Sequence, residues 1–533
     1  MAENTRAVGS VTYREAGHGY FEKRQLRRHA AFWSLWALGV GAVISGDFYG
    51  WNLGLDAGGF GGLLIAAIVI TIMYYGLCFS IAEMSPALPH TGGAYSFSRS
   101  AMGPWGGFIT GLAENMEYVI TPAVVVGAMG FLSHDIVFDL TGTTGWWNSP
   151  VLWWAVYYII FVGINILGIE ITMRFTVLIT VAALAVLAFF FLAVIFSGKF
   201  DASLLTNIPP DEGGSSFLPH GIAGIFPALP FAIWFYLAIE ELPLAAEESH
   251  DPKRDIPRAT IWGLTTLMFF GVGILFLNTG VGGGAAAIST SATPFFDGFK
   301  AVFGEGVGVS LLGILALIGL IASFFTIIYA YGRNTYSLSR AGYFPQVLSL
   351  THPTRNTPYV ALIVGAVIGY VLSLVIYFLG QSESAVAGKI VGALLYMAVF
   401  GAVISYFMQS LAFIVLRKKL PNIVRPYRSP VGIWGAAIAG AIALVALVSL
   451  FLNEDYRPGV YGTAVYFVIG IIFFAVRGRH KLVLSPEEEF AMSHGQHGAN
   501  LQEEGYGTVS VTEIAGDETA SSAPVNEPPT RSP

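Results

Sequence analysis

The feature that most constrains this chain is a series of long apolar segments separated by short polar loops. About 20 mostly apolar residues are enough for an α-helix to cross the hydrocarbon layer of a membrane. Backbone polar groups find no water inside lipid, so such segments are expected to be helices rather than open strands. Twelve segments qualify, at residues 31–56, 60–85, 104–133, 151–171, 174–197, 222–246, 259–282, 306–332, 358–379, 389–415, 430–453 and 459–476. The sequence therefore predicts an all-α integral membrane protein with 12 transmembrane helices.

Composition excludes several other classes of protein. Of the 533 residues, 54% are apolar and only 11% are charged, whereas roughly 25% of the residues in a soluble domain are charged. The formal net charge of −7 excludes nucleic-acid binding as a main function. A single cysteine, Cys78, excludes a disulfide framework or a cysteine-based metal site within the chain. We find no metal-ligand cluster or nucleophile elbow, so neither enzyme activity nor a metal or cofactor is expected.

The distribution of Lys and Arg predicts the orientation. Cytoplasmic loops are enriched in these residues. With the N-terminus in the cytoplasm, an even number of spans returns the C-terminus there. Residues 1–30 are then a cytoplasmic N-terminal segment, and the polar residues 478–533 are expected to form a largely disordered cytoplasmic tail. Only four of the 27 basic residues fall outside, namely Lys199, Lys300, Lys389 and Arg457.

Two of the predicted spans carry residues that interrupt helices. The first reads GVGAVISGDFYGWNLGLDAGG over 39–59, with Asp47 near its middle. The sixth reads GIFPALPFAIWFYLAIEELP over 224–243, with Glu240 and Glu241 inside an apolar stretch. Proline removes a helix donor, and glycine lowers the cost of leaving the helix. Each span is therefore a candidate discontinuous helix, and kinked packing helices are the alternative.

The order of these two spans predicts an internal repeat. Spans one and six begin two blocks of five and run in opposite directions, as expected for a 5+5 inverted repeat with the substrate site where the broken helices meet. The first repeat covers residues 31–200 and the second covers 201–416. Residues 417–477 then form two extra C-terminal helices.

Acidic residues at membrane depth are costly and are functional hypotheses by default. The candidates are Asp47, Glu114, Glu117 and Glu240, with Glu241 as a weaker one. No Lys or Arg lies deep in any predicted span. A buried carboxyl group can hold a proton or bind a cationic ligand. Both possibilities suit a transporter of a small organic cation.

Each candidate acid also has a structural alternative. Glu114 and Glu117 are three apart and share a helix face, and Glu117 either meets the substrate ammonium or bonds a neighbouring helix as a protonated acid. Asp47 either accepts from the ammonium or caps the half-helix that begins near Phe48. Glu240 is expected to cap a half-helix N-terminus, with substrate contact in addition.

Aromatic residues cluster at the second break. Trp234, Phe235 and Tyr236 follow one another there. An aromatic face attracts an alkylammonium by cation–π contact, worth about 0.5–2 kcal/mol. Simple core packing is the alternative for most aromatic residues inside a membrane.

Three polar loops resemble those of the amino acid–polyamine–organocation (APC) transporter superfamily. They read SPALPHTGGAYSFSRSAMGPWGGF (85–108), AAEESHDPKRDIPRA (245–259) and YGRNTYSLSRAGYFP (331–345). The resemblance covers about residues 30–475. It implies a LeuT-like fold that works by alternating access, around a site formed by spans one, three, six, eight and ten.

Two departures from the superfamily point to a cationic substrate. Amino acid carriers hold the substrate carboxylate on a Gly-Ser-Gly-like turn in the first break, but here Asp47 would repel a carboxylate. Glu117 stands where those carriers often have small or neutral residues. Together with GLAENMEYVITPAVVV (111–126), the first span looks most like the bacterial ethanolamine permease group. The resemblance thus implies a bacterial inner (plasma) membrane importer of ethanolamine, with membrane lipid around it.

The resemblance also assigns residues of the substrate site. It implies first-break contacts from Ser45, Gly46 and Asp47, a third-span ligand Glu117, a stacking or gating Trp234 and a sixth-span acid Glu240. The buried acids and the aromatic cluster add Glu114 and Tyr236 as candidate substrate-binding residues. The lysine that some proton-coupled relatives carry in span five is missing from 179–188. The coupling ion, proton or sodium, is therefore left open. An amino acid or polyamine permease of the same fold and a non-transporting amine sensor are the alternatives.

Overall fold

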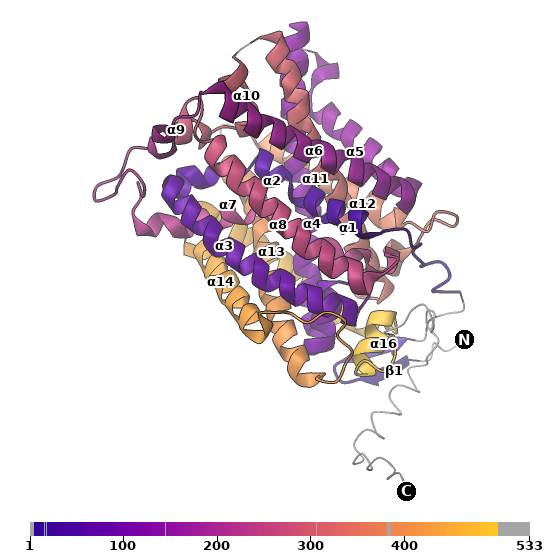
Figure 1. Cartoon of the computed structure of the whole chain (residues 1–533). Coiled ribbons are helices and arrows are strands. Elements are labelled where there is room, and N and C mark those ends of the chain that lie inside the picture. The colour runs from indigo at the N-terminus through magenta and orange to yellow at the C-terminus, as the bar shows by residue number, and fades with distance from the viewer. Residues whose placement is uncertain are drawn as a thin grey trace, which may run out of the picture.

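The computed structural model describes residues 5–14, 16, 19–143, 145–304, 306–380, 385–452 and 454–498. Most of these residues form one bundle of helices, with a small sheet at the end where β1 and α16 lie (Figure 1). Within the described residues, ten helices are long and apolar enough to cross a membrane. Two shorter apolar helices, Phe32–Phe48 and Ile222–Ile233, correspond to the first and sixth predicted spans.

The elements follow one another along the chain in this order. The α-helices are α1 (Phe32–Val43), α2 (Ser45–Phe48), α3 (Leu53–Ala87), α4 (Ala94–Thr141), α5 (Pro150–Leu167), α6 (Ile169–Ser197), α7 (Ile225–Ile233), α8 (Pro252–Leu277), α9 (Gly284–Ile288), α10 (Pro294–Phe303), α11 (Val307–Arg340), α12 (Tyr359–Gly380), α13 (Ala385–Lys419), α14 (Gly432–Leu452), α15 (Arg457–Val476) and α16 (Pro486–Met492). The 3₁₀ helices are η1 (Trp146–Asn148), η2 (Ala202–Thr206), η3 (Ile222–Gly224), η4 (Ile239–Glu248), η5 (Gln346–Ser349), η6 (Glu454–Tyr456) and η7 (Gly478–His480). The strands are β1 (Thr5–Val8), β2 (Val11–Arg14) and β3 (Leu482–Val483).

The interruptions predicted in the first and sixth spans are confirmed. In the first span, α2 ends where Tyr49 turns to extended backbone with φ −158°. In the sixth, α7 ends at Ile233, and η4 begins after Ala238, which has φ +80°. A left-handed conformation costs an L-residue roughly 1–2 kcal/mol, so the surrounding packing must hold Ala238 in place.

Some predicted helix boundaries are wrong in an informative way. Residues 53–56, assigned to the first span, belong to α3, which is interrupted by Gly59 at φ +67°. The predicted eighth span ended at residue 332, but α11 continues to Arg340. Hydropathy ends a helix where polar residues begin. Here those polar residues are buried and paired, so the helix continues inside the protein.

The predicted disordered tail is also wrong in its first part. Residues 478–498 are folded and include β3 and α16. β3 pairs in parallel with β2, which pairs antiparallel with β1. Residues 499–533 of the predicted tail lie outside the described residues.

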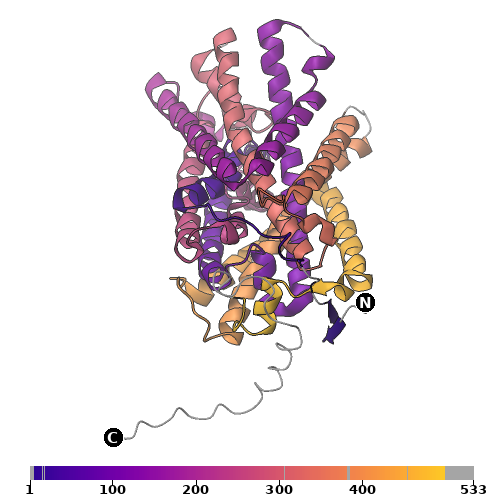
Figure 2. The same ribbon diagram turned by 90° about the vertical axis from the view of Figure 1, so that its right-hand side faces the viewer.

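Helix packing brings distant spans together around the interrupted ones. α4 packs against α11 and α13, while α3 packs against α7 and α8. α1 packs against α6, α8 and α11. The turned view in Figure 2 shows the helices crossing at different tilts, with α16 and β1 again at one end. These contacts surround the two breaks with side chains from several spans.

Candidate functional site

The two broken helices meet backbone to backbone at Gly46 and Trp234. A Cβ atom at Gly46 would lie 1.9 Å from the carbonyl oxygen of Trp234. A Cβ atom at Gly50 would lie 3.4 Å from the Trp234 ring. A Cβ atom does not fit between Gly46 and the Trp234 carbonyl, so glycine is required at this crossing of the first and sixth spans. The structure therefore brings together two of the predicted site residues, Gly46 and Trp234.

Ser45 fastens the first break to α11. Its hydroxyl donates to Ser323 Oγ at 2.8 Å. Ser323 in turn donates to the carbonyl of Ala42, one turn earlier in the first span. Ser45 thus holds the break in position and is bonded within the protein in this conformation.

Asp47 is buried beside α8, in α2 and just before the first break. The prediction that it caps a half-helix beginning near Phe48 is wrong, because α2 ends at Phe48 and the next helix begins at Leu53. The Asp47 side chain is 1% exposed. Within the part of the chain that the structure describes, neither carboxylate oxygen has a hydrogen-bond partner. A Cβ atom at Gly271 of α8 would lie 3.6 Å from Asp47 Oδ1, and the charge of Asp47 acts on Tyr236. A buried charge without a partner is costly, so this position needs a proton or a cation.

A second acidic position forms where α4 faces the start of η4. Glu117, Glu240 and Glu241 are all buried. None of their carboxylate oxygens has a hydrogen-bond partner of good geometry among the described residues, although the hydroxyls of Tyr406 and Tyr118 lie close to Glu240. Glu240 acts electrostatically on both Glu117 and Glu241. Glu117 and Glu240 are close enough to share a hydrogen bond, but two carboxylates can do so only when one carries a proton. The name central acidic cluster is used below for these three residues.

Glu114 lies next to the cluster but is satisfied by the protein. Its carboxylate accepts from Asn334 Nδ2 at 3.2 Å and from the Tyr118 hydroxyl at 3.5 Å. Asn334 also accepts from Asn115 at 3.2 Å. Glu114 therefore connects α4 to α11, and its oxygens are less available to a ligand than those of Glu117.

Tyrosine side chains connect the two acidic positions. The Tyr236 hydroxyl bonds to Thr71 at 2.7 Å, and its ring lies 5.1 Å from that of Tyr74. Tyr74 donates to the Tyr406 hydroxyl at 2.9 Å. The charge of Glu240 acts on both Tyr74 and Tyr406. Tyr74 and Tyr406 were not predicted from the sequence, because a tyrosine in an apolar span is indistinguishable from a core-packing residue.

The predicted acidic residues therefore occupy two separate positions in the structure. Glu114, Glu117 and Glu240 are brought together, whereas burial alone acts on the carboxyl group of Asp47. Trp234 and Tyr236 lie in the second break. A small, mainly apolar pocket adjoins the first break on the side of Phe48 and Tyr49. Among the described residues, no group of three or more His, Cys, Asp or Glu could hold a metal ion.

Comparisons with known proteins agree with this architecture. The family model described as amino acid permease matches residues 31–474. The branched-chain amino acid permease BcaP of Bacillus subtilis is 26% identical over 487 residues, covering 86% of this chain and 94% of its own. The methylthioribose transporter of Bacillus subtilis is 26% identical over 483 residues, covering 87% and 96%. The solved structure of MhsT in complex with L-phenylalanine has a TM-score of 0.58 at 14% identity, covering 82% of this chain and 100% of its own.

Proposed function

The chain belongs to the amino acid permease family, and we propose that it is a secondary transporter that imports ethanolamine or a close small alkylammonium compound by alternating access. The family indicates a multi-pass membrane transporter rather than an enzyme. The observation that carries the choice of substrate is the central acidic cluster, whose carboxylate oxygens lack a hydrogen-bond partner of good geometry among the described residues.

The charge of the cluster selects for a cation without a carboxylate. Three buried carboxyl groups attract an ammonium and repel a carboxylate in a medium of low dielectric constant. The charge of Glu240 acts on three tyrosines, Tyr74, Tyr406 and Tyr118. Their rings can face an ammonium, and their hydroxyls can bond the hydroxyl of ethanolamine.

We assign separate roles to the two acidic positions. Glu117 and Glu240 bind the ammonium in the centre. Asp47, whose charge acts on Tyr236, is a second position for the cation, or for a coupling proton, as the breaks rearrange. A coupling sodium ion is the alternative, since unwound backbone carbonyls bind it in transporters with broken helices.

The membrane arrangement is part of the same proposal. Twelve crossings follow if the two interrupted spans cross together with the ten long helices. The repeats at 31–200 and 201–416, helices 11–12 at 417–477, cytoplasmic termini and a bacterial inner membrane complete it. β1 and α16 lie at the same end of the bundle (Figure 1), as expected if both termini are on one side of the membrane.

An amino acid permease of the same fold is the second candidate function. The printed names of relatives favour it, because BcaP is a branched-chain amino acid permease at 26% identity. A polyamine carrier is a further form of this candidate, and a non-transporting amine sensor is the third. These candidates differ in substrate charge and in whether label accumulates.

Uptake of radiolabelled ethanolamine into proteoliposomes, with and without proton and sodium gradients, tests the proposal. We expect accumulation that other small alkylammonium compounds compete for and zwitterionic amino acids do not. Strong competition by an amino acid or a polyamine would move the assignment to that substrate. Binding without accumulation would identify a sensor.

Two substitutions test the site within the same assay. Asp47→Asn and Glu117→Gln remove a charge and keep the shape of the side chain, so we expect both to lose most uptake while the protein stays folded. Glu170→Gln is the matched control, because Glu170 is 51% exposed and pairs with Arg174 on the surface. Wild-type uptake in both acid variants would show that the site lies elsewhere.

A further inference from the structure

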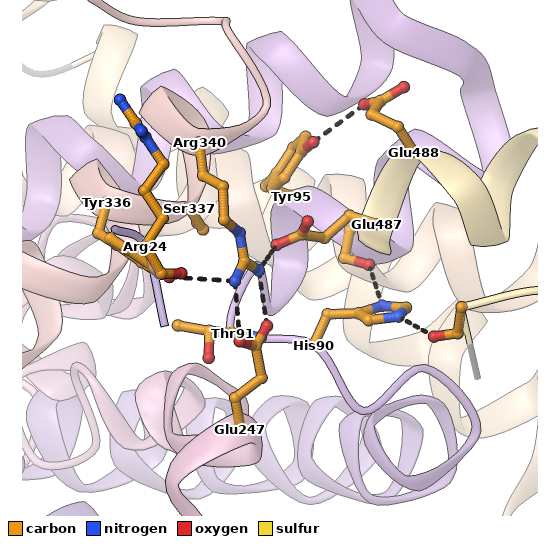
Figure 3. A network of polar contacts seen from close by, with 12 residues as sticks. Arg24, His90, Thr91, Tyr95, Glu247, Tyr336, Ser337, Arg340, Glu487 and Glu488 are labelled. Carbon is orange, nitrogen blue, oxygen red and sulfur yellow. Dashed lines mark hydrogen bonds and ion pairs between the residues drawn. The ribbon is translucent and has the colours of Figure 1, made fainter. Parts of the chain in front are cut away.

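The folded C-terminal segment, residues 482–498, inserts acidic side chains into the end of the bundle where β1 lies. Glu487 and Glu488 of α16 are fully buried. Figure 3 shows both carboxylates pointing into a network of Arg, Tyr and His side chains from other elements. We call residues 482–498 the terminal segment.

Glu487 shares one arginine with the sixth span. Arg340, at the end of α11, donates to Glu487 at 2.6 Å. The same guanidinium donates to both carboxylate oxygens of Glu247, at 2.6 and 2.8 Å. Glu247 lies in η4, the inner part of the interrupted sixth span. Arg340 therefore joins the terminal segment, α11 and the sixth span in one buried contact (Figure 3).

Glu488 connects the terminal segment to a second set of elements. It accepts from Arg99 Nε at 2.6 Å and from the hydroxyls of Tyr95 and Tyr343 at 2.9 Å each. It also accepts from Tyr13 of β2 at 2.5 Å. One carboxylate thus joins the start of α4, the end of α11 and the N-terminal strand.

Backbone contacts hold the terminal segment at both of its ends. Val483 N donates to the Ala341 carbonyl at 2.9 Å, and Leu482 is paired with Tyr13 in the sheet. At the other end, the Gly498 carbonyl lies 2.6 Å from Nε2 of the buried His90. The segment therefore bridges the loop before α4 and the end of α11.

We propose that the terminal segment is a lock that keeps this end of the transporter closed and must leave its Arg–Tyr docking surface before the end opens. The proposal rests on the proposed function, because alternating access requires a path from the centre to each end. Glu247 lies near the end of η4, and Glu240 and Glu241 of the central acidic cluster lie at its start. Opening this end separates η4 from α11, and Arg340, shared by Glu247 and Glu487, opposes that separation.

A buried reporter cysteine tests the lock without any substrate. Cys78 is the only cysteine of the chain and is buried. In a Cys78→Ala background, Thr91→Cys places a thiol beside Glu247, since Thr91 N donates to Glu247 at 3.1 Å and Thr91 is fully buried. Maleimide labelling of this thiol, in full-length protein in proteoliposomes, measures how often the end opens.

Two ways of removing the lock are compared with a surface control. The first variant combines Glu487→Gln with Glu488→Gln, and the second is a chain that ends at residue 477. We expect each to raise the labelling rate about tenfold or more, because breaking a buried ion pair costs several kcal/mol. Glu170→Gln removes a surface carboxylate and is expected to leave the rate unchanged. A synthetic peptide of residues 482–498 is expected to restore protection to the shortened chain, and the same peptide carrying both Gln substitutions is not.

The outcomes separate the lock from a structural role and from the choice of substrate. Unchanged labelling in folded variants would overturn the lock. Loss of monodisperse protein in both lock variants would overturn it too, since the segment would then be part of the core. Faster labelling supports the lock even if ethanolamine is not transported, because the reporter needs no substrate.

Discussion

The two ends of η4 carry buried acids in opposite circumstances. Glu240 and Glu241, at its start, have carboxylate oxygens without a hydrogen-bond partner of good geometry among the described residues, although the charge of Arg333 acts on Glu241. Glu247 and Glu248, at its end, are paired with arginines of α11 at 2.6 and 2.9 Å. All four are buried in one 10-residue element. Burial alone therefore does not distinguish the two ends of η4; a hydrogen-bonded arginine partner does.

This difference has a functional meaning. A permanent arginine neutralises a carboxylate in every state and joins two elements. A carboxylate without such a partner is stable only while a proton or a transient cation occupies it. The paired acids at the end of η4 hold the fold together, whereas those at its start are suited to a substrate that arrives and leaves.

The largest expected effect comes from the unpaired side of the comparison. Glu117→Gln should reduce ethanolamine uptake by about 100-fold or more, since losing a charged partner in a buried pair costs 2–5 kcal/mol. Thermal stability should stay equal or rise, because no protein cation loses its partner. Uptake and melting of the same purified variant are compared with Glu114→Gln, which keeps Glu117 and should lose less. A melting temperature that falls together with uptake would contradict the difference between the two ends.

Removing the charge of an arginine-paired acid should lower the stability of the protein. Glu248 accepts from Arg333 at 2.9 and 3.0 Å and from Tyr329 at 2.5 Å. Glu248→Gln leaves the Arg333 charge buried without its counter-charge, so the free energy of unfolding should fall by about 3 kcal/mol. Denaturation in detergent measures this fall. Glu170→Gln, on the surface, should change it by less than about 1 kcal/mol, and an equal loss in both variants would remove the distinction.

The crossing of the two breaks gives a smaller effect. Gly46→Ala places a Cβ atom 1.9 Å from the Trp234 carbonyl oxygen, and overpacking of this kind costs about 1–3 kcal/mol. Stability and uptake should both fall. Gly127→Ala in α4 is the control, since no atom lies within 4 Å of a Cβ there. If Gly46→Ala behaves like Gly127→Ala in melting and uptake, the close crossing is not needed.

The smallest effect is expected from pH at the paired end. Burial lowers the pKa of His90, which also faces Glu487, Glu247 and Arg340. His90 therefore stays neutral when folded, while an unfolded histidine takes up a proton below about pH 6.5. Stability is full above that pH and falls as pH drops, by at most about 1.4 kcal/mol per unit. Melting at pH 7.5 and 5.5 should show this fall, and His90→Gln should reduce it; an equal fall in the variant would assign it to other groups.

Much of the fold could be predicted from the sequence because its signals are local. Glycines around Asp47 and prolines before Glu240 predicted where the first and sixth helices break, and both breaks are present. The errors lie at polar helix ends. Hydropathy placed Arg333 and Arg340 outside the membrane-spanning helix and Glu487 in a disordered tail. Arg340 pairs with Glu487, 147 positions away, and Arg333 pairs with Glu248, 85 positions away. These pairings allow the residues to be buried, and no local pattern contains them.

The candidate site was predicted in part. The residue types of Glu117 and Glu240 identified them as acids at membrane depth, and the structure places them together. Asp47, predicted as a contact for the same substrate, lies beside Gly271 of α8. Tyr74 and Tyr406 were missed, because their value comes from neighbours on other spans.

The sequence by itself determined that apolar helices form, where two of them break and that uncompensated acids lie among them. These properties depend on hydropathy, on glycine and proline geometry and on residue charge, all of which act within a few positions. Only the tertiary structure decided which acids received a permanent arginine and which did not. That choice depends on which helices become neighbours, because electrostatic pairing acts through space and is independent of separation along the chain.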